Sequence, residues 1–424
     1  MTYQESLDYL YGLQKFGIKL GLENIRTFLS RLGHPEKKYK SVLVAGTNGK
    51  GSIASALAAT LVSSGYRVGL YSSPHLHSFS ERIRINGEMI PESRIAEMVA
   101  AMHPLAESIP LTFFEFTTAL ALQYFSENEV DIAILEVGLG GRLDATNAVE
   151  PILSVIAPVA FDHQQYLGDN LRDIALEKAG IMRSGVPVVS AGQHPESLQA
   201  LDAEASKIGT TVFAGQRDFH RVEHERTFDY VGFNHQIKQI QPGVAGRHQF
   251  DNMATALAAA ELLQQNGYAL SAATMRATVE NLTWPGRLEW LSKKTILLDG
   301  AHNSAAAGVL GRFLADNGFD NVHWIVGMKA DKKVKDILGP IISGTKMLYC
   351  VEPPVEEAAC RDDLVRVATA QGGSATAFVS IADALGAARK ALVDNEIVLV
   401  AGSLFLVAAV RELIFAEEGR PCGK

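Results

Sequence analysis

Cysteine is scarce in this sequence of 424 residues. Only Cys350, Cys360 and Cys422 are present, and no CxxC pair occurs among them. A disulfide framework or a structural zinc site needs more cysteines at closer spacing, so we expect neither. The composition indicates a reducing compartment, and we expect a cytoplasmic protein.

An excess of positive charge is also lacking. The chain has 39 Lys and Arg against 47 Asp and Glu, a formal net charge of -8. This balance argues against nucleic acid or an anionic membrane surface as the main partner. The first residues show no basic segment followed by an apolar one, so we expect no signal peptide. The longest apolar run, residues 397–410, is too short to span a bilayer, and its Gly402-Ser403 break predicts a buried strand, a turn and a helix.

A glycine-rich segment, SVLVAGTNGKGSIASALAATLVSSG (residues 41–65), reads as an apolar strand, a turn and a small-residue helix. Phosphate-binding loops are built in this way, because the glycines let backbone N–H groups and the helix end face an anion. Lys50 can neutralise a phosphate, and Ser52 can cap the helix or touch a metal. The segment departs from GxxxxGK[ST], since two residues separate Gly46 from Gly49 and Gly51 follows the lysine. The alternative is a simple strand-to-helix turn with a solvated lysine.

Polar side chains follow three other apolar strands, namely Ser72 and Ser73, Glu136, and Asp162 and His163. The carboxyl ends of parallel strands gather at one crevice, where ligands bind. A hydroxyl, a carboxylate and an imidazole beside a triphosphate predict a magnesium site. Taken singly, each group has a plainer interpretation: a turn, a salt bridge, and a hydrogen-bonded loop histidine.

Apolar runs without polar alternation, separated by helical stretches, predict a parallel sheet buried on both faces. Alternating residues near 211–245 predict a small antiparallel ribbon. We expect an α/β protein with a P-loop-containing, parallel-sheet N-terminal ATPase domain over residues 1–285. A linker at 286–294 and a smaller, Rossmann-like α/β C-terminal domain over 295–424 follow. Asp299 and His302 end a strand of that second domain and offer another anion or nucleotide contact.

With these residues assembled, the sequence resembles the folylpolyglutamate synthase/dihydrofolate synthase family of the Mur ligase superfamily. The resemblance runs almost from end to end. Its motifs are GLENI (21–25), AGTNGKGS (45–52), SSPHL (72–76), FSERIRING (79–87), TFFEFTTALA (112–121), EVGLGGRLDATN (136–147), DHQQYLGDN (162–170), EKAGI (177–181), HQFDNMATAL (248–257), PGRLEWL (285–291), LLDGAHN (297–303) and AGSLF (401–405).

The resemblance implies a ligase that uses ATP and magnesium to join L-glutamate to dihydropteroate or to reduced folates through an acyl phosphate. Lys50, Lys178 and His163 match catalytic residues, and Lys178 matches a lysine that the family carries as a carbamate. From the residues alone, Lys178 reads as an ordinary cation at a helix end. The implied metal ligands are Ser73, Glu136 and His163. The implied ATP contacts are Asn48, Gly49, Lys50, Gly51, Ser52, Asn252, Arg287, Asp299, His302 and Ser403.

For the pterin substrate, the resemblance implies three segments: Gly21, Leu22 and Glu23; Thr112, Phe113, Phe114 and Glu115; and Leu143, Asp144 and Ala145. The two phenylalanines suit a flat ring, and Asp144 can pair with its polar edge. Core packing and capping of the turn before Thr146 are the respective alternatives.

Three other functions fit the sequence less well. A peptidoglycan Mur ligase normally carries a nucleotide-sugar domain ahead of the loop, and only 45 residues precede Gly46 here. The displaced Ser52 and the DGAHN motif argue against a P-loop phosphotransferase, and the filled family positions argue against a catalytically inactive folate-binding module. TFFEFTT and GGRLDATN favour a bifunctional enzyme over a dedicated folylpolyglutamate synthase. The family is usually monomeric.

Overall fold

The structure, a computed structural model, describes residues 1–17 and 21–421, so Cys422 lies outside the described residues. Its internal contacts divide the chain into two compact units. The first unit comprises residues 1–75, 79–243 and 249–282, and the second comprises 76–78, 244–248 and 283–424.

The first unit is built on an eight-stranded sheet of order β4-β3-β2-β5-β1-β6-β7-β8. Strand β1 pairs in parallel with β5 and β6, with Val44 opposite Glu136 and Ala45 opposite Ile156. This register brings the carboxyl ends of the three strands to one edge. Only β3 and β4 run antiparallel to their neighbours in this sheet. The strands are β1 (Lys40–Ala45), β2 (Val68–Tyr71), β3 (Ile83–Ile85), β4 (Glu88–Met89), β5 (Ile132–Glu136), β6 (Pro151–Ile156), β7 (Val188–Ser190) and β8 (Val212–Ala214).

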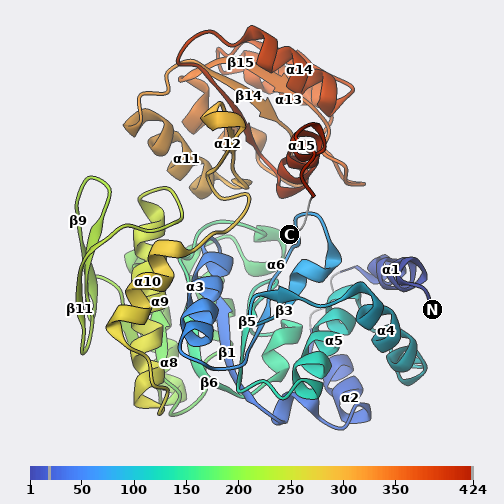
Figure 1. Ribbon diagram of the computed structural model, residues 1–424, viewed down its shortest axis with the longest axis vertical. Helices are drawn as coiled ribbons and strands as arrows, with labels where there is room; N and C mark the ends of the chain where they lie inside the picture. The colour runs from blue at the N-terminus through green and yellow to red at the C-terminus, as the bar shows by residue number, and fades with distance from the viewer. Residues whose placement is uncertain (18–20, 422–424) are drawn as a thin grey trace. The chain divides into compact units, whose positions relative to one another are not determined.

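Helices cover both faces of this sheet (Figure 1). Helix α3 packs on β1, β2 and β5, and α10 packs on α3. Helices α1, α2, α4, α5, α7 and α8 contribute to a separate hydrophobic core with the residues of the other strand faces. The helices are α1 (Tyr3–Gly12), α2 (Glu23–Arg31), α3 (Lys50–Ser63), α4 (Glu92–Ala106), α5 (Phe113–Glu127), α6 (Gln164–Leu167), α7 (Leu171–Ala179), α8 (Pro195–Ile208), α9 (His248–Gln265) and α10 (Ala272–Asn281), with 3-10 turns η1 (Leu13–Phe16), η2 (Pro35–Lys37), η3 (Phe79–Arg82) and η4 (Ala145–Ala148).

A separate three-stranded antiparallel sheet of order β11-β10-β9 lies within the span 211–245 (Figure 1). Its strands are β9 (His220–Glu223), β10 (Phe228–Val231) and β11 (Gln236–Ile240). Phe228 stacks on Phe250 of α9, with the ring centroids 5.2 Å apart. The first residues of the span form β8 and extend the large parallel sheet instead.

The second unit holds a six-stranded sheet of order β12-β13-β17-β14-β15-β16, parallel except for β12. Helices α11, α12 and α13 pack on one face, and α14 and α15 pack on the other. Because β17 returns between β13 and β14, the sheet has a topological switch point at their carboxyl ends. The elements are β12 (Glu289–Leu291), η5 (Ser292–Lys294), β13 (Ile296–Leu298), α11 (Ser304–Asp316), β14 (Val322–Val326), α12 (Val334–Ile342), β15 (Thr345–Cys350), α13 (Arg361–Ala370), β16 (Ala375–Ala377), α14 (Ile381–Ala391), β17 (Ile397–Ala401) and α15 (Leu404–Glu417).

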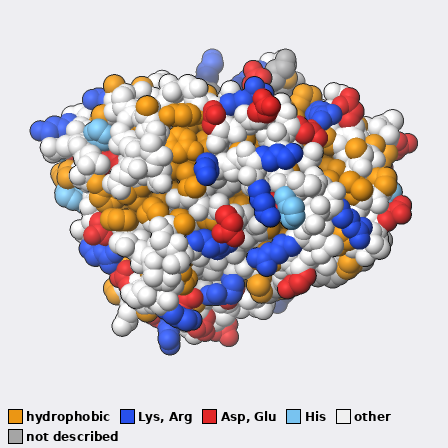
Figure 2. Space-filling view, turned by 90° about the horizontal axis from the view of Figure 1, so that it is seen from below, with side chains coloured by type: hydrophobic (Ala, Val, Ile, Leu, Met, Phe, Trp, Pro, Cys, Tyr) orange, Lys and Arg blue, Asp and Glu red, His pale blue; other side chains and the backbone are white. Residues whose placement is uncertain are grey.

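The predicted α/β class, with a large parallel-dominated sheet and a second α/β sheet, is confirmed. The apolar run 397–410 is strand β17 followed by the start of α15, as its glycine-serine break predicted. Within the described part of the chain, no helix is long and apolar enough to cross a membrane. Figure 2 shows positive and negative side chains interspersed with apolar ones over one face, as is usual at a protein surface.

Candidate active site

The glycine-rich loop joins β1 to α3 and is held in a conformation that requires glycine. Gly49 caps α3 with φ +86°, a left-handed conformation that other residues adopt at a cost. A Cβ at Gly49 would also collide with the side-chain amide of Asn252, a buried residue of α9. The fold therefore brings Asn252 against the glycine-rich loop. Ser52 lies buried inside α3.

Two lysines converge on one carbonyl oxygen of this loop. Lys50 Nζ donates to Gly46 O at 3.2 Å and to Thr47 O at 3.1 Å. Lys178 Nζ, from α7, donates to the same Gly46 oxygen at 2.9 Å. The Lys50 side chain and the N-terminus of α3 create a positive region suited to a phosphate anion, and Lys178 lies beside them.

Lys178 lies in the last turn of α7, which Gly180 caps, but it is only 2% exposed and is therefore not an ordinary surface cation. Burial, and next the charge of Lys50, lowers the pKa of Lys178 from 10.5 to about 7. A substantial fraction of neutral amine therefore exists at neutral pH.

Ser73 and Glu136 of the predicted metal set lie in contact. Glu136 ends β5, is buried, and its Oε2 accepts a hydrogen bond from Ser73 N at 3.1 Å. His163 caps the short helix α6 with φ +49°, and its Nε2 lies 3.9 Å from Asp162 Oδ1. Carboxylate and hydroxyl oxygens fit a hard divalent cation. Among the described residues, no group of three or more His, Cys, Asp and Glu side chains is placed to hold a metal. The predicted set contains only two residues of these types, Glu136 and His163, because its third member is Ser73.

The side chains of Thr112 and Glu115 cap helix α5. Thr112 Oγ1 accepts from Glu115 N at 3.2 Å, while Glu115 Oε2 accepts from Thr112 N at 2.8 Å. Both residues are buried. This reciprocal capping box was missed in the sequence, although its T-x-x-E spacing was readable.

Phe113 and Phe114 are half-buried, so neither is a pure core residue. Phe113 stacks on Tyr11 with centroids 5.6 Å apart and the rings 14° from parallel, and the guanidinium of Arg82 lies 5.3 Å from the Phe113 centroid. Phe114 lies over Gly138, where a Cβ would come within 2.5 Å of the ring. Gly138 thus makes room for this aromatic ring, a function that the sequence analysis did not assign to it.

Asp144 holds its own loop together. Its Oδ2 accepts from Leu139 N at 2.8 Å and its Oδ1 from Thr146 N at 3.0 Å, so the capping alternative is what the structure contains. Burial raises the pKa of Asp144 above its ordinary value. Beside it, Leu143 is 36% exposed and Ala145 is buried.

The segment 21–23 contributes mainly backbone and one exposed carboxylate. Leu22 packs in the hydrophobic core, and Glu23 begins α2 with an exposed side chain. A Cβ at Gly21 would lie 2.7 Å from Glu23 Oε2. Residues 18–20, which precede this segment in the sequence, lie outside the described residues.

In the second unit, four predicted nucleotide contacts lie just before β12 or after the carboxyl ends of β13 and β17. Asp299 Oδ2 accepts from Leu288 N at 3.0 Å and its Oδ1 from Ala301 N at 2.9 Å. His302 Nδ1 is bonded to Gly300 O at 2.8 Å. A side chain at Gly300 would collide with the guanidinium of Arg287. The fourth residue, Ser403, caps α15 through its side chain, and Asn303, next to His302, caps α11.

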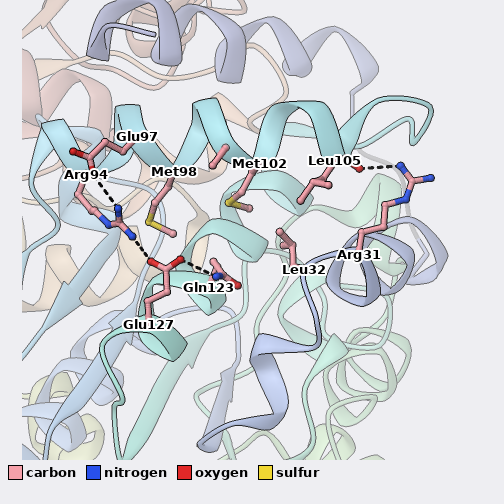
Figure 3. A pocket seen from close by; sticks show the side chains of 10 residues that line it. Arg31, Leu32, Arg94, Glu97, Met98, Met102, Leu105, Gln123 and Glu127 are labelled. Carbon is pink, nitrogen blue, oxygen red and sulfur yellow. Dashed lines mark hydrogen bonds and ion pairs between the residues drawn. The ribbon is translucent and has the colours of Figure 1, made fainter.

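A cavity of about 260 Å³ opens elsewhere, between α2, α4 and α5 (Figure 3). Met98 and Met102 form its apolar part, and Arg94 is ion-paired there with Glu97 and Glu127. The α5 residues that line it, Gln123 and Glu127, are at least ten residues beyond Phe113, roughly 15 Å along the helix. The cavity contains none of the predicted site residues.

Comparison with known proteins places these features in a family. Residues 44–260 match the family described as Mur ligase middle domain, and residues 289–413 match dihydrofolate synthetase, C-terminal domain. The dihydrofolate synthase/folylpolyglutamate synthase of Bacillus subtilis is 33% identical, over 97% of this chain and 99% of that protein. A probable bifunctional folylpolyglutamate synthase/dihydropteroate synthase of Haloferax volcanii is 35% identical over 97% of this chain, which spans half of that protein.

The fold agrees with a solved structure of the same kind. Escherichia coli FolC in complex with DHPP and ADP superposes with a TM-score of 0.91 at 33% identity, covering 99% of each chain. The chain belongs to the folylpolyglutamate synthase/dihydrofolate synthase family and is an amide-forming ligase of the Mur type.

Proposed function

We propose that this ligase uses ATP to join L-glutamate both to dihydropteroate and to reduced folates. Full-length similarity to a relative named for both activities supports two substrates. The convergence of Lys50 and Lys178 on the oxygen of Gly46 is the observation that carries the ATP-dependent part. A monofunctional folylpolyglutamate synthase is the second candidate.

The proposed reaction has two steps. A carboxylate oxygen of the pteroate or folate attacks the γ-phosphorus, the bond to ADP breaks, and an acyl phosphate forms. The amino group of glutamate then attacks the acyl carbon, loses a proton, and expels phosphate as the C–O bond breaks. Both steps concentrate negative charge on the transferred phosphoryl group, so fixed positive groups stabilise them.

The first unit supplies those groups. We assign the phosphates of ATP to the N–H groups that begin α3 and to Lys50, within the set Asn48, Gly49, Lys50, Gly51 and Ser52, with Asn252 beside them. From the second unit we assign Arg287, Asp299, His302 and Ser403 to the nucleotide. The Asp299 carboxylate and the Ser403 hydroxyl already accept hydrogen bonds from their own loops, so their proposed role includes shaping the backbone there.

We assign Mg²⁺ to Ser73, Glu136 and His163, where it supplies charge neutralisation for the phosphates. Lys178 is the proposed site of a carbamate. Carbamate formation requires a neutral amine to attack CO₂, and the lowered pKa of Lys178 supplies that form at neutral pH.

The pterin ring is assigned to the segments 21–23, 112–115 and 143–145. The capping contacts of Thr112, Glu115 and Asp144 fix the backbone of these segments, so Phe113 and Phe114 are presented by a rigid helix start. Rigid support of this kind improves the orientation of a bound substrate.

We further propose that the chain acts as a monomer in the cytoplasm, with domains 1–285 and 295–424 joined by the linker 286–294. Two described cysteines, Cys350 and Cys360, are free thiols, which fits a reducing compartment. Light scattering during size-exclusion chromatography tests the monomer, and a mass of twice 45.7 kDa would contradict it.

The decisive assay follows ADP release from the purified chain. We expect release only when ATP, glutamate and a pteroate-type acid are present together, and we expect Glu136→Gln and His163→Ala to abolish it while the fold is retained. ATP turnover indifferent to both acceptors would indicate a phosphotransferase instead. Turnover with tetrahydrofolate but none with dihydropteroate would favour the monofunctional candidate.

A further inference from the structure

Arg82 is a buried cation that contacts Phe113 of the predicted pterin site and is hydrogen-bonded to the turn that carries the predicted metal ligand Ser73. It ends η3 and is 8% exposed. Its Nε donates to His75 Nδ1 at 2.7 Å, and its guanidinium carbon lies 5.3 Å from the ring centroid of Phe113. Arg82 lies within the FSERIRING motif, and none of the catalytic, metal, ATP or pterin residue sets given above includes it.

The backbone of Arg82 is fixed to the turn that carries Ser73. Ser72 N donates to Arg82 O at 3.0 Å, and the next residue, Ser73, donates its N–H to Glu136 Oε2 at 3.1 Å. The side-chain bond to His75 holds the same turn from its other end. Arg82 is therefore positioned rigidly with respect to Glu136.

The side-chain contacts of the Arg82 guanidinium are with aromatic or imidazole rings, and the Glu136 carboxylate acts on its charge without forming an ion pair. Burial lowers its pKa, while Tyr71, Tyr11 and Glu136 act in the opposite direction. Among the residues that the structure describes, no ion pair to a carboxylate compensates this guanidinium. An uncompensated buried charge is costly, so such a site favours an anion supplied from outside the chain.

Arg411 of the second unit shows the usual solution. It is 7% exposed and lies 4.1 Å from the ring centroid of Phe415, an arrangement close to that of Arg82 and Phe113. Its Nε, however, donates to Glu289 Oε1 at 3.0 Å. In the corresponding place, the Nε of Arg82 donates to an imidazole, that of His75, instead of to a carboxylate.

We propose that Arg82 binds the carboxylate of the pteroate-type substrate and holds it for phosphoryl transfer. The proposal rests on the proposed function. The reacting carboxylate has to lie between the pterin ring, which we assign to the Phe113 segment, and the metal, which we assign to Glu136. The guanidinium of Arg82 lies over the ring of Phe113, and its backbone is hydrogen-bonded to the turn that contacts Glu136. A planar guanidinium suits a carboxylate because it can donate two parallel hydrogen bonds.

The experiment compares two ligands and three proteins without ATP. Pteroate and its uncharged carboxamide are titrated by calorimetry into the wild-type chain, into Arg82→Gln, which keeps a donor but loses the charge, and into Arg84→Gln. Arg84 is the control because it is a cation of the same segment whose Nε donates to Glu81 O. Circular dichroism checks folding, and Arg82→Lys, which keeps the charge, serves as a second variant.

We expect Arg82→Gln to weaken pteroate binding roughly 10- to 100-fold and to change carboxamide binding by less than about 3-fold. Arg82→Lys should weaken pteroate binding less than Arg82→Gln does, and Arg84→Gln should leave the affinity for both ligands unchanged. In turnover, Arg82→Gln should raise the KM for dihydropteroate and leave the KM for ATP unchanged. If Arg82→Gln weakened the binding of pteroate and of the carboxamide equally, or weakened neither, the proposal would be overturned even if the wild-type chain ligates normally. A wild-type chain that does not ligate dihydropteroate would instead refute the proposed function.

Discussion

Replacing Lys178 with methionine tests whether the environment of this lysine is as described. The amine donates to Gly46 O, and its burial, followed by the nearby charge of Lys50, lowers its pKa to about 7. An unfolded lysine titrates near 10.5. Between these two values the unfolded chain binds more protons than the folded chain, so the free energy of unfolding rises with pH over this window.

The size of the effect follows from the two pKa values. At pH 7 the folded lysine is half-protonated and the unfolded one fully protonated, and by pH 9 the folded lysine is neutral. Integrating the difference in bound protons from pH 7 to pH 9 gives about 2 kcal/mol of stability gained by the wild-type chain. Lys178→Met lacks this titration, so the difference between the two proteins should change by that amount in favour of the wild type.

The assay is urea unfolding at both pH values, in CO₂-free buffer so that the free amine titrates. All three tryptophans, Trp284, Trp290 and Trp324, belong to the second unit, so their fluorescence follows that unit alone. Far-UV circular dichroism follows both units, and the transition not seen by fluorescence belongs to the first. Lys207→Met, which removes an exposed lysine of α8, gives the baseline for losing a surface charge. A pH-independent difference between Lys178→Met and the wild type would refute the buried environment.

Two further substitutions test the loops around the site. Gly49→Ala introduces a Cβ at φ +86° that collides with Asn252, so we expect a KM for ATP raised at least about 10-fold, and unchanged nucleotide kinetics would contradict the loop assignment. Gly138→Ala places a Cβ 2.5 Å from the ring of Phe114, so we expect a higher KM for dihydropteroate with the KM for ATP unchanged. A higher KM for ATP alone would show that Phe114 does not serve the pterin.

The layout of strands was predictable because it depends on local pattern. The strands that became β1, β5 and β6 are mostly apolar and almost entirely buried, and the break at Gly402-Ser403 marked the end of β17. The turn from β1 into α3 was likewise predictable from its glycines. Such features need only the residues of one segment.

Contacts between distant segments were not predictable from pattern alone. Lys178 lies 132 residues from Gly46, and nothing in its own helix distinguishes a buried amine from a solvated one. Asn252 reaches Gly49 because the tertiary fold brings the first turns of α9 against the glycine-rich loop, and its assignment came from family resemblance. Arg82 was overlooked because burial of a charged residue depends on its three-dimensional neighbours. The capping of α5 by Thr112, by contrast, had a local signal that was missed.

The central claim, that an acyl phosphate forms from the substrate carboxylate, can be tested most directly with an isotope. Dihydropteroate labelled with ¹⁸O in both carboxylate oxygens is incubated with ATP, glutamate and the purified chain, and the released phosphate is analysed by mass spectrometry. Because the attacking oxygen leaves with the phosphate, the account predicts one ¹⁸O in each phosphate released per amide formed. Amide formation with phosphate free of ¹⁸O would contradict it.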